Sequence, residues 1–330
     1  MNTLSLNPKL FDADVEQLPI RKGFGEGLLQ AGVEDHNVVG MCADLTESTQ
    51  MHLFAKQFPD RYVQGGIAEQ SMASVASGMA AMGKIPFFSS YSAFSPGRNW
   101  EQIRTTICYN DVNAKVVGSH AGISVGPDGG THQAIEDIAI TRVIPRMTVI
   151  VPCDAIEAKK ATLAAAKFVG PVYIRLGREN TPVLTTLDTP FSIGKAEVYF
   201  RPREGMTPVV GIIATGVMVS YALRVAKKLE EEGVGVAVMN LATIKPLDTE
   251  SVLAFAKECG KILTVEEHQK RGGLGSVIAE FLAENHPVPM SLVGIDDQFG
   301  QSGTPDELYH HYGIDTEGIL KKTKELVQRT

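Results

Sequence analysis

A glycine-rich segment carries the side chains best suited to chemistry in this sequence. It runs from Gly118 to Gln133 and holds His120, Asp128 and His132 directly after an apolar run. Loops at the ends of strands are where α/β domains place functional groups. Two imidazoles beside a carboxylate can orient hydroxyl groups, carry protons or bind a metal. A turn rich in Gly and Asp could hold the same residues without a function, so this segment alone leaves both interpretations open.

Glu69 is a second candidate, at the start of a predicted helix over residues 68–82 that is rich in small side chains. An acid in the first turn is favoured by the helix dipole by about 0.3–1 kcal/mol, which is a purely structural explanation. Tyr91 and Phe94 follow an apolar run, where aromatic residues commonly belong to the core. None of these three residues identifies a site by itself.

Four further polar residues are unremarkable when each is considered alone. Arg21 reads as a surface cation, Ser48 as a turn serine, Arg178 as a strand-end arginine and Asp44 as a structural turn acid. The planar fork of arginine nevertheless suits a pair of phosphate oxygens. The two arginines are therefore candidates for binding an anion.

Taken together, five stretches in one order make the sequence resemble the transketolase family. They are Arg21–Gly25, Ala43–Ser48, Gly66–Gln70, Gly118–Gln133 and Ile174–Glu179. The family uses thiamine diphosphate to move two-carbon ketol units between sugars. Single-chain members carry a diphosphate-binding domain, then a pyrimidine-binding domain, then a C-terminal domain, and this chain resembles the last two. The family's Gly-Asp-Gly motif with a downstream Asn, which holds magnesium and diphosphate, does not occur in this sequence.

The resemblance implies cofactor roles for four residues. Glu69 matches the glutamate that hydrogen-bonds a ring nitrogen of the cofactor's aminopyrimidine and so promotes loss of the thiazolium proton. Tyr91 and Phe94 match aromatic residues that stack on the pyrimidine. Asp44 matches an aspartate near the cofactor at the subunit interface.

The resemblance also implies substrate roles along the sugar channel. His120 and His132 would bind or protonate the donor's carbonyl and hydroxyl oxygens, and Asp128 would recognise a hydroxyl. The terminal phosphate would be bound by Arg21, Ser48 and Arg178. A metal site at the two histidines is the rival interpretation, but no fourth ligand lies nearby in the sequence, so no metal ligand is predicted in this chain.

Two departures from the family pattern lie beside the channel. Pro127 stands where an acid is usual, and Ala121-Gly122 stand where Asp-Ser is usual. They bear on acceptor choice rather than on cofactor chemistry. The Gly272–Gly275 run lacks the Lys-Ser/Thr of a phosphate loop, so close helix packing explains it better.

Composition narrows the class of protein. The 330 residues are 44% hydrophobic with a net charge of −7 and no dense Lys/Arg tract, which argues against nucleic acid or an anionic membrane as the main partner. No apolar run is long enough to span a bilayer and no signal peptide is recognisable, so neither secretion nor anchoring is expected. Widely spaced cysteines predict reduced, buried thiols in a cytoplasmic protein, at Cys42, Cys108, Cys153 and Cys259.

Short Val/Ile-rich runs alternate with helical patterns along most of the chain, including helices predicted over residues 133–141 and, in an Ala-rich segment, over residues 155–167. This alternation predicts an α/β fold with two parallel or mostly parallel sheets covered by helices on both faces. The resemblance implies that these are the pyrimidine-binding domain and the transketolase C-terminal domain. We expect an N-terminal arm over residues 1–15 that becomes ordered only on contact with something else, a first domain over 16–180, a linker over 181–194 and a second domain over 195–330.

The combined hypothesis is the C-terminal subunit of a split transketolase. It would act on phosphorylated sugars with thiamine diphosphate and Mg²⁺. It would form a heterotetramer with a second copy of itself and with a diphosphate-binding subunit, which supplies the magnesium ligands. The alternatives are a 1-deoxyxylulose-5-phosphate synthase-like half, the beta subunit of a 2-oxo-acid dehydrogenase and a non-catalytic regulatory subunit. The beta subunit should lack the Asp-Gly-x-Thr-His loop and the paired arginines, which this sequence has.

Overall fold

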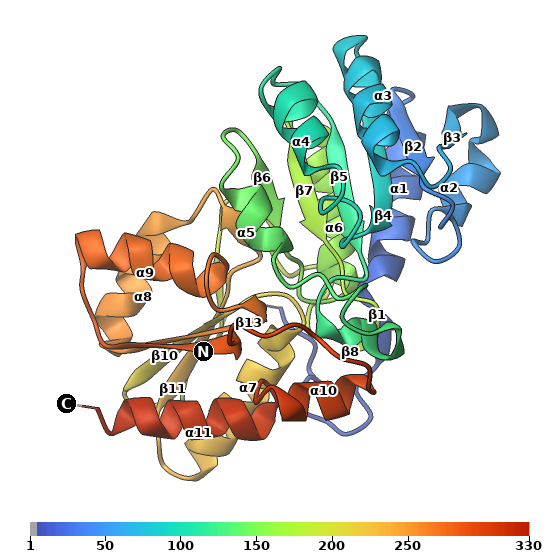
Figure 1. Cartoon of the computed structure of the whole chain (residues 1–330). Coiled ribbons are helices and arrows are strands. Elements are labelled where there is room, and N and C mark those ends of the chain that lie inside the picture. The colour runs from blue at the N-terminus through green and yellow to red at the C-terminus, as the bar shows by residue number, and fades with distance from the viewer. Residues whose placement is uncertain (1–4, 330) are drawn as a thin grey trace.

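Two large sheets covered by helices make up most of the chain in a computed structural model, which describes residues 5–329 (Figure 1). A small antiparallel sheet pairs β1 (Gln17–Pro19) with β8 (Asn180–Pro182). The first sheet has the strand order β12-β6-β7-β5-β4-β2-β3, and every neighbouring pair except β12 with β6 is parallel. Its central strands are buried on both faces, as parallel strands under helices must be. The bounds are Val38–Cys42 (β2), Tyr62–Gln64 (β3), Ile85–Tyr91 (β4), Lys115–Ser119 (β5), Thr148–Ile150 (β6), Val172–Arg175 (β7) and Thr243–Lys245 (β12).

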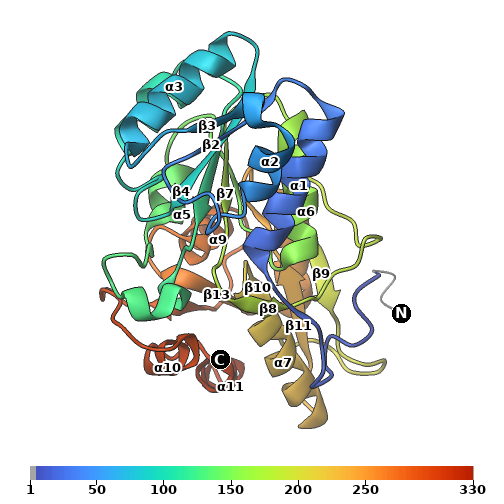
Figure 2. The same ribbon diagram turned by 90° about the vertical axis from the view of Figure 1, so that its right-hand side faces the viewer.

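Helices cover both faces of this first sheet (Figure 2). One face carries α1 (Ile20–Glu34), α2 (His52–Gln57) and α6 (Ala155–Lys167), and the other carries α3 (Glu69–Ala81), α4 (Trp100–Gln102), the π-helix η2 (Ile103–Cys108) and α5 (Asp137–Arg142). Helices α1 and α6 approach so closely that a Cβ on Gly23 would lie 1.7 Å from the Ala155 carbonyl oxygen. Only glycine therefore fits at that crossing.

The second sheet has five strands in the order β14-β13-β10-β11-β9. Only the edge strand β9 is antiparallel to its neighbour. Helices α7 and α11 lie on one face, and α8 and α9 lie on the other (Figure 1). The bounds are Glu197–Phe200 (β9), Val210–Ala214 (β10), Met218–Glu231 (α7), Val236–Asn240 (β11), Thr249–Cys259 (α8), Ile262–Gln269 (β13), Leu274–Asn285 (α9), Met290–Ile295 (β14), Pro305–His311 (α10) and Thr316–Val327 (α11). The α/β fold with two mostly parallel sheets is thus confirmed.

Two short strands depart from the simple alternation that the sequence predicts. Strand β12 belongs to the C-terminal half by sequence, yet it pairs antiparallel with β6 and completes the first sheet. Strand β9 was likewise not visible in the pattern. Strands of three or four residues carry too few alternations to be recognised. The result is a first sheet whose edge comes from the second half of the chain.

The N-terminal segment, of which residues 5–15 are described, lies against the segment that joins the two domains. The Asn7 side chain donates to the Val183 carbonyl at 2.7 Å, and Val15 is buried. The Asp154 carboxylate at the start of α6 accepts from the backbone N–H groups of Leu184 and Thr185 at 2.8 and 2.6 Å. The contacts that order the predicted arm are therefore made within the same chain.

The chain after the histidine-containing loop is less helical than predicted. We expected a helix over residues 133–141, but α5 begins only at Asp137. The Gln133 side-chain amide instead donates to the carbonyls of Ile123, Gly126 and Gln301. These bonds hold residues 133–136 outside the helix and tie the loop to the C-terminal domain.

The cysteines and the helices agree with the composition. All four cysteines are buried and free, as predicted. Within residues 5–329, no helix combines the length and the apolar character needed to cross a bilayer.

Candidate active site

The candidate residues gather at the carboxyl edge of the first sheet. Ser48 follows β2, Tyr91 ends β4, His120 follows β5 and Arg178 follows β7, while Arg21 lies in the first turn of α1. Carboxyl ends of parallel strands meet along one edge, where α/β proteins bind ligands. The fold therefore brings together residues that are more than one hundred positions apart in the sequence.

His120 is the centre of this group. Its Nε2 lies 2.7 Å from Arg21 Nη1 and 3.3 Å from Ser48 Oγ, and its ring stacks on Tyr91 with centroids 4.1 Å apart. Ser48 Oγ and the Tyr91 hydroxyl are 2.9 Å apart. Four of the predicted site residues thus form one hydrogen-bonded cluster.

The Arg21 contact decides the protonation of His120. A guanidinium can only donate, so Nε2 must accept, which assigns the ring proton to Nδ1, 3.0 Å from Ser119 Oγ. Burial, followed by the charges of Arg21 and Arg178, lowers the pKa of His120 to about 3. His120 is therefore a neutral imidazole near pH 7, with its Nε2 lone pair directed at the site.

Arg178 and Asp128 form the other side of the group. Arg178 Nη1 donates to the Val125 carbonyl at 2.6 Å and lies 3.4 Å from Asp128 Oδ1, and its Nε lies 3.6 Å from Glu179 Oε1. Burial first, and then the charge of Arg178, lowers the pKa of the Arg21 guanidinium. Two cations are thus held near one another at the edge of the sheet.

His132 joins the group through aromatic contacts. Its ring packs edge-on against Phe94 at 5.3 Å and against Tyr91 at 6.3 Å between centroids. Its Nδ1 lies 2.9 Å from Thr131 Oγ1. Both histidine rings therefore lie against Tyr91.

Glu69 lies at the first turn of α3 and is 1% exposed. Its Oε1 accepts from Ser90 Oγ at 3.1 Å and its Oε2 accepts from Arg98 Nη1 at 2.8 Å. The Arg98 guanidinium also stacks over the Phe94 ring at 4.6 Å. Glu69 is therefore a buried carboxylate whose partner Arg98 stacks on an aromatic ring. An acid that served only to stabilise the helix dipole would not need to be buried.

Sequence reasoning did not identify Ser90 or Arg98. Ser90 is a small polar residue within an apolar strand, and Arg98 is the cation in the Pro-Gly-Arg turn after Phe94. Two signals were available in the sequence. Ser90 is polar and lies next to the end of the strand, and Arg98 is a charged residue four positions after the candidate Phe94. Only the fold shows that both reach Glu69.

Asp44 is not brought into this group. It is exposed with a φ of 59°, and its backbone N–H donates to Gln64 Oε1 at 2.8 Å. Among residues 5–329, its carboxylate has no hydrogen-bond or ion-pair partner. Asp44 therefore faces outward from the chain.

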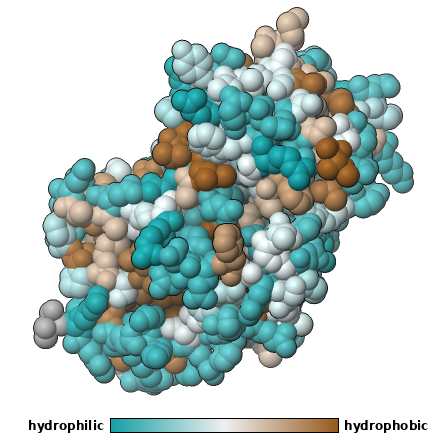
Figure 3. Space-filling model, in the orientation of Figure 1, coloured by the Kyte–Doolittle hydropathy of each residue, from teal (hydrophilic) through white to brown (hydrophobic). Residues whose placement is uncertain are grey.

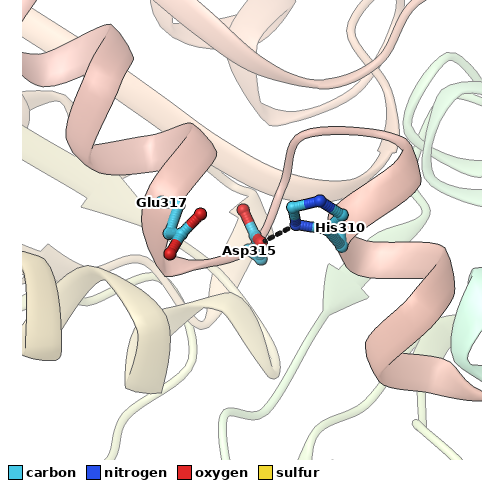
Figure 4. Close-up of side chains that lie close together, drawn as sticks. All are labelled: His310, Asp315 and Glu317. Atoms are coloured by element: carbon cyan, nitrogen blue, oxygen red, sulfur yellow. Dashed lines mark hydrogen bonds and ion pairs between the residues drawn. The ribbon is translucent and has the colours of Figure 1, made fainter.

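Only one group of three potential metal ligands converges within residues 5–329, and it lies outside this site. His310, Asp315 and Glu317 have ligand atoms within 4.8 Å of one another (Figure 4). Asp315 Oδ1 caps α11 by accepting from Gly318 N, and its Oδ2 pairs with His310 Nδ1 at 2.9 Å. A helix cap with an exposed ion pair accounts for this arrangement, and no metal role follows from it.

Comparisons with known proteins agree with the fold. The model of the transketolase pyrimidine-binding domain matches residues 16–183, and that of the transketolase C-terminal domain matches residues 202–319. The chain therefore belongs to the transketolase family, as the C-terminal section of a split enzyme.

Similar chains of nearly the same length carry related names. A putative transketolase C-terminal section from Methanocaldococcus jannaschii is 43% identical, with 94% of this chain and 96% of that one covered. A 6-deoxy-6-sulfo-D-fructose transketolase subunit from a Clostridium species is 39% identical, with 97% and 98% covered. The solved structure of a split-gene transketolase, described as an inactive β4 tetramer, has 39% identity and a TM-score of 0.85, with 94% and 99% covered.

Single-chain transketolases are about twice as long. Rat transketolase is 34% identical over 95% of this chain but only 50% of its own length. This chain thus corresponds to one half of such an enzyme.

Proposed function

We propose that this chain provides the pyrimidine pocket and the sugar-binding side chains of a thiamine-diphosphate-dependent transketolase. It would transfer a two-carbon ketol unit from a ketose phosphate to an aldose phosphate, together with a separate subunit. The buried Glu69 carboxylate between Ser90 and Arg98 is the observation that carries the proposal. A buried carboxylate costs several kcal/mol unless a function or a full set of partners compensates for it.

The residues around Glu69 suit an aminopyrimidine. Glu69 can share a proton with a ring nitrogen, and Tyr91 and Phe94 provide aromatic surfaces for a flat ring. Arg98, whose side chain is 45% exposed, occupies one carboxylate oxygen in the chain alone and can be displaced toward solvent. Bound thiamine diphosphate would supply the carbon nucleophile that carries the ketol unit.

The other end of the site suits the substrate. Arg21, Arg178 and Ser48 present donors to a tetrahedral anion, and neutral His120 can accept a hydrogen bond from a sugar hydroxyl at Nε2. His132 and Asp128 lie on the same loop and would contact hydroxyl groups of the sugar chain. The proposed donor is therefore a ketose with an anionic terminal group, for which a phosphate is the simplest candidate.

Relatives named for different substrates suggest more than one kind of anionic terminal group. One is named for 6-deoxy-6-sulfo-D-fructose and another, 36% identical from Phocaeicola vulgatus, for apulose-4-phosphate. Sulfonate and phosphate share tetrahedral oxygens but differ in charge. The phosphate preference of this chain is thus a proposal that a direct comparison of the two donors would decide.

A partner subunit completes the site in this proposal. The chain lacks the magnesium and diphosphate motif, so the ligands for Mg²⁺ would lie on that subunit. Exposed apolar side chains lie before, on and after α3, at Ile67, Val75 and Met82, which are 74, 48 and 85% exposed. Exposed apolar side chains next to a catalytic carboxylate suit a subunit interface. Figure 3 shows hydrophobic atoms in separate patches on a mostly hydrophilic face, so a continuous apolar band is not visible there.

The proposed assembly is a heterotetramer that contains two copies of this chain. The similar split-gene chain is described as inactive when it forms a β4 tetramer, which supports the need for the other subunit. Asp44, which faces outward without a partner among the described residues, would meet the cofactor only at that interface. A beta subunit of a 2-oxo-acid dehydrogenase is disfavoured by the retained loop and arginines.

Titration calorimetry tests the proposal directly. The chain alone should bind thiamine diphosphate with Mg²⁺ barely or not at all, because the sequence lacks the motif that holds magnesium and diphosphate. Mixing with the diphosphate-binding subunit should create both binding and ketol transfer, and the cofactor should in turn tighten the assembly. Micromolar, magnesium-dependent binding by this chain alone would overturn the split site, since it represents about 8 kcal/mol without a visible source.

A further inference from the structure

The loop that carries Asp128 and His132 packs against the C-terminal domain. The contact is made by the segment after β14, residues 296–304, and it brings backbone against backbone. A Cβ on Gly130 would lie 2.6 Å from the Gly300 carbonyl oxygen, so no side chain fits between the two segments. The C-terminal domain therefore forms one wall against which this loop is held.

Gln133 links the two segments through its side chain. Its amide nitrogen donates to the Ile123 and Gly126 carbonyls within the loop at 3.1 and 3.2 Å, and to the Gln301 carbonyl of the C-terminal segment at 2.9 Å. The amide has two N–H groups for three acceptors, so one N–H is shared. Gln133 is 3% exposed, and these bonds therefore form away from solvent.

The same loop holds an arginine of the candidate site. Arg178 Nη1 donates to the Val125 carbonyl at 2.6 Å and lies 3.4 Å from Asp128 Oδ1. Val125 lies between the two loop residues whose carbonyls accept from Gln133. A shift of the loop would therefore displace Asp128 and Arg178 together.

We propose that Gln133 is a positioning residue for donor recognition, and that the C-terminal domain acts on the donor through it. By holding the loop, Gln133 fixes where Asp128 meets a sugar hydroxyl and where Arg178 meets the terminal anion. The inference rests on the proposed function, because it assumes that these side chains contact the donor. It extends that function by giving the C-terminal domain a part in the choice of donor.

A purely structural role for Gln133 would have a different kinetic signature. A destabilised chain yields less active enzyme, which lowers kcat for every donor and leaves KM unchanged. A displaced loop weakens binding only of donors that reach it. The cofactor pocket stays intact in that case, because Glu69 hydrogen-bonds to Ser90 and Arg98 instead of to the loop.

Two substitutions disturb the contact from opposite sides. Gln133→Met keeps the length of the side chain and removes its N–H groups. Gly300→Ala adds a Cβ that would lie 1.7 Å from Gln133 Oε1, so the flexible amide has to move. The φ of Gly300 is outside the left-handed region, so alanine can adopt its backbone conformation. Gln301→Ala is the matched control, because that side chain is exposed and the backbone carbonyl is retained.

Steady-state kinetics of the assembled complex test the inference. With fructose 6-phosphate as donor, Gln133→Met and Gly300→Ala should each raise KM about tenfold at nearly unchanged kcat, the size expected for one or two lost hydrogen bonds. Hydroxypyruvate, which has no phosphate, should keep its kcat and show a smaller rise in KM. Gln301→Ala should change none of these constants. Unchanged constants, or a loss of kcat with both donors at unchanged KM, would overturn the inference.

Amide hydrogen exchange on the chain alone tests the positioning without ketol transfer. The N–H groups of Gly129 and His132 bond within the loop to the carbonyls of Gly126 and Gly129, each at 3.0 Å. Both variants should speed exchange over residues 123–132 and leave α6 unchanged, and the control should do neither. Unchanged exchange in the loop refutes the inference even where ketol transfer proceeds. Faster exchange with a wild-type complex that transfers no ketol units would overturn the proposed function, while the support of the loop by Gln133 would stand.

Discussion

Two clusters of arginines and carboxylates in the first domain have similar side chains but different exposure to solvent. At the carboxyl edge of the sheet, Arg98 and Arg178 approach carboxylates while remaining 45 and 31% exposed. At the boundary with the second domain, Asp137 Oδ2 accepts from Arg175 Nε at 2.8 Å and from the Tyr173 hydroxyl at 2.6 Å, and the Arg175 side chain is only 6% exposed. The first cluster is open to a ligand and the second is closed.

The closed cluster shows how buried charge positions the domains. Arg175 Nη2 also donates to the Glu267 carbonyl of β13 at 2.9 Å, which links the two sheets. A second buried carboxylate, Glu157 of α6, accepts from Tyr199 and Asn240 of the second domain at 3.1 and 2.8 Å. Paired interior groups of this kind fix orientation, whereas partly exposed groups remain available for chemistry.

Glu69 should separate activity from stability most clearly. In the assembled complex, Glu69→Gln should slow ketol transfer about 10²- to 10⁴-fold, because it removes the acid–base group of the cofactor pocket. Unfolding of the chain should change little, since Arg98 can turn to solvent. Steady-state rates and cofactor proton exchange by NMR are the measurements, with Glu101→Gln as an exposed control. An unchanged exchange rate would remove Glu69 from the mechanism.

Asp137 should show the opposite pattern. Asp137→Ala leaves the Arg175 charge buried without its partner and should lower the free energy of unfolding by about 3–5 kcal/mol. The double variant Asp137→Leu/Arg175→Met removes both charges and should recover part of that loss. Denaturant unfolding of the three proteins checks this, and a double variant less stable than the single one would contradict a paired, closed cluster.

Arg178 should have a smaller effect that depends on the substrate. Arg178→Ala removes charge-assisted hydrogen bonds worth about 1.5–3 kcal/mol, which lowers kcat/KM for a phosphorylated donor about 10- to 100-fold. Hydroxypyruvate, which has no phosphate, should be spared, and Arg271→Ala at an exposed ion pair serves as the control. Equal losses with both donors would mean that Arg178 acts by holding the Val125 loop.

Glu157 should give the smallest effect, and it is visible in its pH dependence. Burial first, and then the charge of Asp154, raises the pKa of Glu157 to about 7. Between pH 4.5 and 7 the folded state keeps a proton that the unfolded state releases, so this group makes stability fall as pH rises. Relative to Glu157→Gln, the wild type should lose about 1 kcal/mol for each pH unit across that range. A difference between the two proteins that does not change with pH would contradict the raised pKa.

Much of the fold could be predicted because its signals are local. Helix α6 agrees at both ends with the Ala-rich segment over residues 155–167, and the apolar runs at β2, β5 and β10 are buried strands. The start of α5 was wrong because Gln133 uses its side chain to bind the carbonyls of a distant segment. Helix propensity depends on the local sequence, so it does not include hydrogen bonds to a distant segment that comes close only after folding.

The residues of the candidate site can likewise be divided into those that the sequence suggested and those that it did not. The resemblance to transketolases named Glu69, His120, His132 and Arg178 as candidate site residues, since each lies in one of the matched stretches. Arg98 and Ser90 were missed because they act on Glu69 across the sheet edge, from 29 and 21 positions away. Asp44 was expected near the cofactor, and its outward position keeps that role a prediction that depends on the partner subunit.

The sequence by itself determined the family, the two α/β layers and most of the chemical groups at the site, because these follow from local pattern and motif order. Only the tertiary structure decided that His120 is neutral with its proton on Nδ1 and that the guanidinium groups of Arg178 and Arg98 each pair with a carboxylate. Each of those properties depends on burial and on donor–acceptor distances between residues far apart in the chain. Such quantities exist only once the strands are side by side.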